Sequence, residues 1–267
     1  MAVKNYLILK HYTLTDAFFL WTDPESLAQA TSKYDSMKRI LIDSAELFLQ
    51  DLDEIIVTQK TVKHDQYMFK DHMQVIDDLY HDHPCNIMYC DLDTVFIKPT
   101  KVFGEYDHFC MLEHQCGIRY YPHGGVPESL WEIQRNGLAQ WDETAGPEHG
   151  YLPDSPYLWH REQNIFVDMI NAVIAEIGID RGGENSMVKF WNLIHCVYNK
   201  WGQNKLDPNA ISIVHYNGTG TQFDPVEIAQ TLFSLAKQGD TDRIAALMNT
   251  RLYSHRIQYD HNGNVIG

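Results

Sequence analysis

Two carboxylates stand inside an otherwise apolar stretch of the chain, and these residues are the ones best suited to carry chemistry. Asp91 and Asp93 flank Leu92, with one apolar run before them and another after them. Burying a carboxylate is costly unless it is paired or binds a metal. In an extended backbone, residues i and i+2 face the same side, so both aspartates can face one ligand while Leu92 faces the core. Two such oxygen ligands suit Mg²⁺ or Mn²⁺ shared with a phosphate. The alternative is a pair of helix- or turn-capping carboxylates at the end of a strand.

His215 is a second candidate. It stands near the end of an apolar strand predicted over residues 211–216, and the glycine-rich turn of residues 217–220 follows. A neutral imidazole can complete a metal shell that carboxylates begin. Backbone N–H groups in the turn, at Gly218 for example, can meet a phosphate. A histidine satisfied within the core is the alternative interpretation of His215.

Three further residues have types that fit the same chemistry. Glu162 and Gln163 open a predicted helix after a long loop, although acidic residues are also common at helix starts because of the helix dipole. Lys70 lies on the helix that leads into the Asp91 strand and could neutralise phosphate. A solvated lysine is the alternative there.

The elements that position these residues follow from the spacing of apolar side chains. The pattern predicts strands at residues 6–12, 54–58, 86–90 and 107–113, and helices at residues 32–51 and 66–81, with Ser32 as a possible cap. A β-α-β-α-β start indicates an α/β protein with a parallel sheet. Asp91 then lies at the carboxyl end of the third strand, where open α/β sheets bind ligands.

The rest of the chain is predicted to be less regular at first and helical at its end. Glycine and proline mark residues 134–156 as a long loop, and residues 115–127 are rich in glycine, histidine and tyrosine. Helices are predicted at residues 162–177, 225–238 and 240–250. We therefore expect one main domain over residues 1–222 and a small C-terminal helical extension over residues 223–267.

Composition narrows the class of protein. A net charge of −15 over 267 residues, without a basic stripe, argues against a nucleic-acid binder. No apolar stretch approaches the roughly 20 residues that span a bilayer, and no N-terminal signal is evident. The five cysteines are odd in number and lack metal-site spacing. These features predict a cytoplasmic protein with reduced thiols and no transmembrane segment.

Four segments in order resemble the metal-dependent nucleotide-sugar glycosyltransferases of the GT-A fold. Residues 89–99 (Tyr-Cys-Asp-Leu-Asp-Thr-Val-Phe-Ile-Lys-Pro) match the Asp-x-Asp segment of that family. Residues 115–121 resemble the strand after it, residues 159–164 a helix start with Glu-Gln, and residues 214–218 the late His-aromatic-x-Gly motif. The resemblance covers about residues 3–222 and is closest to glycogenin-like and lipopolysaccharide-galactosyltransferase-like retaining enzymes.

The resemblance implies a Rossmann-like GT-A fold, with a mixed, mostly parallel central sheet flanked by helices. It implies transfer of a sugar from a nucleoside-diphosphate sugar, a UDP- or GDP-sugar, to a glycan, lipid-linked or protein acceptor. Asp93 and His215 would bind Mn²⁺ or Mg²⁺, and Asp91 would bind the metal, the donor ribose or both. Glu162 and Gln163 would lie near the anomeric carbon. The aromatic residues Tyr120, Tyr121, Trp131, Trp141 and Trp159 are candidates for stacking on a sugar in the acceptor pocket, and simple loop packing is the alternative for the stretch of residues 119–123.

Two other functions fit parts of the pattern. A haloacid-dehalogenase-type phosphatase would use Asp91 as a nucleophile, with Gly239-Asp-Thr-Asp242 as its last acidic motif. A non-catalytic nucleotide-sugar or glycan-binding protein on the same fold is the third hypothesis. It is kept because Thr221-Gln222-Phe223 stands where the family often has Lys-Pro-Trp.

Overall fold

The computed structural model describes residues 2–14, 24–62, 71–112, 115–140, 165, 168, 188–190, 196–197, 212–216 and 224–251. The chain divides into two compact units. The first unit comprises Met1–Lys38, Gln50–Leu92 and Lys101–Trp191, and the second comprises Arg39–Leu49, Asp93–Thr100 and Asn192–Gly267. The predicted boundary between residues 222 and 223 falls outside the described residues.

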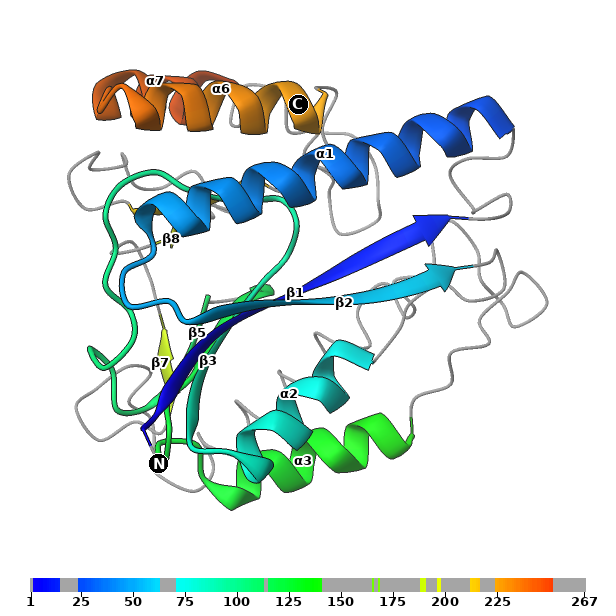
Figure 1. The fold of residues 1–267 in the computed structure, drawn as a ribbon, viewed down its shortest axis with the longest axis vertical. Coiled ribbons are helices and arrows are strands. Elements are labelled where there is room, and N and C mark those ends of the chain that lie inside the picture. Colours follow the sequence, from blue (N-terminus) through cyan, green and yellow to red (C-terminus); the bar gives the residue numbers. More distant parts are fainter. Residues whose placement is uncertain are drawn as a thin grey trace, which may run out of the picture. The chain divides into compact units, whose positions relative to one another are not determined.

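A mixed, mostly parallel sheet forms the centre of the first unit (Figure 1). Its strand order is β2-β1-β3-β6-β5-β7, and its strands are β1 (Lys4–Leu14), β2 (Glu54–Val62), β3 (Cys85–Cys90), β5 (Phe109–Leu112), β6 (Gln115–Tyr121) and β7 (Val188–Phe190). β1 is parallel to β2 and β3, and β5 is parallel to β7. β6 is antiparallel to both β3 and β5. The predicted α/β class with parallel β1, β2 and β3 is therefore confirmed.

Helices flank this sheet. The helices α2 (Asp71–Asp82) and α3 (Glu128–Ala139) cover one face, and the part of α1 (Pro24–Phe48) that belongs to the first unit lies on the other side (Figure 1). The core under α2 and α3 follows from alternation along the strands, which places every second side chain on this face. Its strand and helix members include Tyr6, Ile8, Ile87, Tyr89, Met73, Ile76, Leu130 and Trp131.

The second unit contains a small sheet and the C-terminal helices. Its strands β4 (Thr94–Phe96), β9 (Ile213–His215) and β8 (Cys196–Val197) pair in that order. The helix α6 (Pro225–Lys237) begins with a side-chain cap, because the Asp224 carboxylate accepts from the backbone N–H of Val226 at 2.8 Å. Gly239, with a φ of +70°, ends it.

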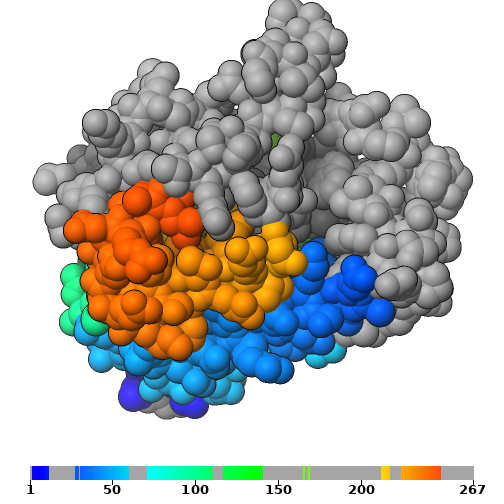
Figure 2. Space-filling model, turned by 90° about the horizontal axis from the view of Figure 1, so that it is seen from above, coloured from blue at the N-terminus to red at the C-terminus, as the bar shows by residue number. Residues whose placement is uncertain are grey.

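The last helix, α7 (Thr241–Arg251), lies beside α6 (Figure 2). The predictions of helices at residues 225–238 and 240–250 are thus confirmed within one residue at either end.

Two segments go beyond what the apolar pattern predicts. Residues 115–121 form β6, a strand that only the family resemblance had implied, and α3 (Glu128–Ala139) extends into residues 134–139, which the sequence had predicted to be part of a loop. Glycine and polar residues obscured both elements. Gln134 is nevertheless fully buried, and Gly137 lies where an added Cβ would come within 2.5 Å of Ile165, so its small size serves close packing rather than a turn.

The first long helix also begins earlier than predicted. α1 begins at Pro24, a residue type favoured in a first helical turn. Ser32 therefore lies inside the helix rather than at its cap, and its backbone carbonyl accepts a hydrogen bond from the Ser36 hydroxyl at 2.9 Å.

Candidate metal centre

The two aspartates of the Asp-Leu-Asp segment lie on a turn between β3 and β4. The prediction of an extended backbone there is wrong, because β3 ends at Cys90 and β4 begins at Thr94. The turn is tied at both aspartates. The Asp91 N–H donates to the Gly117 carbonyl at 2.7 Å, and the Asp93 carbonyl accepts from the Tyr216 N–H at 2.9 Å. Leu92 is buried, as predicted.

Asp93 and His215 form a buried pair. β4 pairs antiparallel with β9, with Thr94 opposite His215, which brings the histidine to the turn. His215 Nε2 lies 3.0 Å from Asp93 Oδ1, and the residues are 3% and 9% exposed. A divalent ion about 2.1 Å from each ligand atom in an octahedron sets adjacent ligands about 3.0 Å apart. The pair therefore already has the spacing of two neighbouring metal ligands.

Asp91 completes a group of three. It is separated from Asp93 only by Leu92, and Asp91, Asp93 and His215 each offer one ligand atom within 4.8 Å of the others. Opposite ligands of an octahedral ion lie about 4.2 Å apart, so a small inward movement would close the group around a cation. Two carboxylates and one imidazole suit a divalent ion such as Mn²⁺ or Mg²⁺.

Tyr216 follows His215 and extends the buried surroundings of Asp93. Its side chain is 2% exposed. Burial raises the pKa of the Tyr216 hydroxyl well above its ordinary value, and the charges of Asp93 and Asp224 raise it further. The hydroxyl therefore stays a neutral phenol at physiological pH.

The side chain of Asp91 has two donors of its own, which sequence reasoning missed. The Tyr89 hydroxyl donates to Asp91 Oδ1 at 2.6 Å, and Lys10 Nζ lies 3.3 Å from the same oxygen. Tyr89 lies opposite Ile8 in the parallel β1–β3 pair, so Lys10, two residues further along β1, reaches Asp91, two residues beyond Tyr89. The only sign of this contact in the sequence is that Lys10 directly follows the apolar run of the first strand.

The remaining predicted site residues lie outside the described residues. These are Lys70, Glu162, Gln163 and Gly218. Their proposed roles remain predictions from the sequence.

The aromatic residues predicted to stack on a sugar lie elsewhere, where they are described. Tyr120, Tyr121 and Trp131 are at most 1% exposed, so they are core residues and the stacking prediction is wrong for them. Trp131 and Tyr121 stack on each other, with ring centroids 5.4 Å apart. Trp141 and Trp159 fall outside the described residues.

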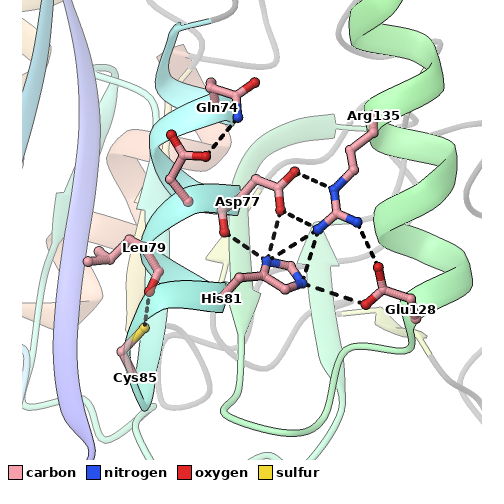
Figure 3. Close-up of polar contacts among 8 residues, drawn as sticks. Gln74, Asp77, Leu79, His81, Cys85, Glu128 and Arg135 are labelled. Atoms are coloured by element: carbon pink, nitrogen blue, oxygen red, sulfur yellow. Dashed lines mark hydrogen bonds and ion pairs between the residues drawn. The ribbon is translucent and has the colours of Figure 1, made fainter.

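A second charged cluster joins α2 to α3 (Figure 3), and we call its residues Asp77, His81, Glu128 and Arg135 the α2–α3 clasp. Arg135 donates to both oxygens of Asp77, at 2.8 and 2.9 Å, and to Glu128 at 2.7 Å. These hydrogen bonds raise the pKa of Arg135. The side chain of His81 is about one-third exposed, and its Nδ1 lies 2.9 Å from Asp77 Oδ1. Both oxygens of Asp77 are thus held by one guanidinium, in the strong bidentate geometry of Arg–carboxylate pairs.

Comparisons with other proteins assign no family to this chain. No protein-family model matches this chain, and a search of curated proteins finds no relative. No helix among the described residues has the length and apolar character needed to cross a membrane.

Proposed function

We propose that this chain is a metal-dependent glycosyltransferase of the GT-A fold, which moves a sugar from a nucleoside-diphosphate sugar to a hydroxyl acceptor. One observation carries the proposal: ligand atoms of Asp91, Asp93 and His215 gather within 4.8 Å, directly after a parallel strand of an α/β sheet. Ligands of open α/β sheets bind outside the carboxyl ends of the strands. The four sequence segments that resemble the family lend it further support.

Each residue has a role in this proposal. Asp93 and His215 hold a divalent ion, and Asp91 holds the ion or the donor ribose. The bound ion supplies a Lewis acid that offsets the charge on the departing diphosphate. Lys70 and the backbone at Gly218 would contact the phosphates. Glu162 and Gln163 would lie near the anomeric carbon, in a retaining reaction, and orient the reacting groups, which is a large part of such catalysis.

The phosphatase alternative gains no support from the acidic residues near the end of the chain. Asp240 lies between α6 and α7, and its carboxylate accepts from the backbone N–H of Arg243 at 3.1 Å. This aspartate caps a helix, a structural task that Asp residues commonly perform.

The test is turnover of a panel of nucleoside-diphosphate sugars, followed as release of the nucleoside diphosphate with Mn²⁺, with Mg²⁺ and with a chelator. We expect one donor to react only with metal. In the Asp93→Asn variant we expect the rate of turnover to fall at least 100-fold. Asp43→Asn, an exposed change on α1, is the matched control. A turnover rate that is the same with and without metal, or that is unchanged in Asp93→Asn, would contradict the proposal. Metal-dependent nucleotide binding without turnover of any donor would favour a binding protein.

A further inference from the structure

Tyr89 lies at a position from which it can control one of the candidate metal ligands. It is the next-to-last residue of β3, fully buried, and two residues before Asp91. Its hydroxyl donates to Asp91 Oδ1 at 2.6 Å, the length of a charge-assisted hydrogen bond between a hydroxyl and a carboxylate. The Asp91 carboxylate therefore accepts a hydrogen bond from a side chain that belongs to the core.

The ring of Tyr89 is held from two elements. Arg119 stands opposite it in the antiparallel β3–β6 pair, with the guanidinium carbon 3.9 Å from the ring centroid. His72 of α2 stacks on the ring at 4.9 Å between centroids, with an interplanar angle of 27°. Cation–π contact and stacking both fix the plane of the ring. The phenol oxygen consequently has little freedom to follow Asp91 if that carboxylate turns.

The donors of Asp91 are unevenly distributed over its two oxygens. Tyr89 and Lys10 both contact Oδ1, the lysine at 3.3 Å. An oxygen whose lone pairs already accept from two donors is a poor metal ligand. Both side-chain contacts that the described residues make with the Asp91 carboxylate fall on Oδ1. Oδ2 is therefore the oxygen better able to bind a ligand.

We propose that Tyr89 is a positioning residue for the metal centre: it fixes the rotamer of Asp91 through Oδ1, so that Oδ2 is the oxygen that binds the cation alongside Asp93 and His215. The inference rests on the metal site of the proposed function. Residues that hold a ligand by hydrogen bonding tune metal affinity without touching the metal. Tyr89 would do so through Asp91 alone.

The test is a titration of the full chain with Mn²⁺ alone, followed by electron paramagnetic resonance of the free ion. Tyr89→Phe keeps the ring and its stacking and removes only the hydroxyl. We expect Mn²⁺ to bind about 10-fold more weakly to this variant. The matched control is Tyr80→Phe, which removes a hydroxyl that donates to the Pro122 carbonyl at 2.8 Å, and it should bind Mn²⁺ as the wild type does.

A double-mutant cycle separates positioning from a general loss of structure. In the Asp91→Ala background, Tyr89→Phe should no longer change the Mn²⁺ affinity, because the residue through which it acts is gone. An undiminished effect in that background, or equal losses in Tyr89→Phe and Tyr80→Phe, would overturn the inference. Thermal unfolding without metal shows that each variant is folded.

The outcome for the wild type distinguishes the two proposals. Wild-type protein that binds no Mn²⁺ would overturn the metal centre and this inference together. Wild-type protein that binds Mn²⁺ as tightly as Tyr89→Phe does would overturn the role of Tyr89 and leave the proposed function standing.

Discussion

Asp77 and Asp91 of the first unit each meet two or more polar side chains, and the two carboxylates are satisfied in different ways. In the α2–α3 clasp, Arg135 meets both oxygens of Asp77, whose side chain is 6% exposed. At Asp91, Lys10 and Tyr89 both meet Oδ1, and the side chain is 25% exposed. The first arrangement saturates its carboxylate and joins two helices. The second places both contacts on one oxygen, in a carboxylate that offers a ligand atom within 4.8 Å of those of Asp93 and His215. A carboxylate that is held but not saturated is the better candidate for a functional site.

Breaking the clasp should produce the largest change in stability. Asp77→Ala removes a buried carboxylate and leaves Arg135, which is partly exposed, without its bidentate partner. We expect the free energy of unfolding to fall by about 2–3 kcal/mol. Urea denaturation measures this loss. The Mn²⁺ affinity of the folded protein should stay the same, and a large loss of that affinity would mean that the two clusters are not separate in function.

Removing the lysine at Asp91 should act on the metal and little on the fold. Lys10→Met keeps the apolar stem and deletes a positive charge 3.3 Å from a ligand carboxylate. With less repulsion we expect Mn²⁺ to bind more tightly by about 1 kcal/mol, roughly fivefold in Kd. Lys98→Met, a change at a partly buried lysine, is the control in the same titration. Weaker Mn²⁺ binding in Lys10→Met would show that the lysine supports the centre instead.

The contact between His11 and Asp35 gives the smallest expected effect, a change in how the free energy of unfolding depends on pH. Burial, and next the charge of Lys38, lower the pKa of His11 below its ordinary value of 6.5, against the opposing effect of Asp35. The folded state therefore binds fewer protons at this histidine than the unfolded state does. The resulting stability is present above pH 6.5 and is lost as the pH falls through that value toward the lower folded pKa.

Replacing the histidine checks this sign. In urea denaturation between pH 7 and about pH 5, His11→Gln should show a flatter decline of the free energy of unfolding than the wild type. A decline of the same slope in both proteins would assign the acid sensitivity to other groups.

The candidate ligands could be predicted from the sequence because their signal is local. Two aspartates within an apolar run, and a histidine between an apolar strand and a glycine-rich turn, stand out without any knowledge of contacts. Tyr89 and Lys10 could not be predicted in the same way. Their meeting at Asp91 depends on the register of β1 against β3, which sets Ile8 opposite Tyr89.

The parts of the fold that were missed have a similar cause. The strands β1, β2 and β3 and the helices α6 and α7 carry clear apolar periodicity, and the sequence predicts them. α3 contains Gln134 and Gly137, which are typical of loops, yet both serve packing that only the folded chain reveals. Likewise, Arg119 is polar in the sequence but lies fully buried on the ring of Tyr89.

The most direct test of the central claim is thermal unfolding with UDP, GDP, ADP, CDP or TDP, each with and without Mn²⁺, in the wild type and in Asp93→Asn. A ligand that binds only the folded protein stabilises it by about 2.7 kcal/mol at 100-fold over its Kd. Our account predicts stabilisation of the wild type by one nucleoside diphosphate, only with Mn²⁺, and none in Asp93→Asn. Stabilisation without metal, or equal stabilisation of the variant, would contradict it, as would the absence of a shift with every nucleotide.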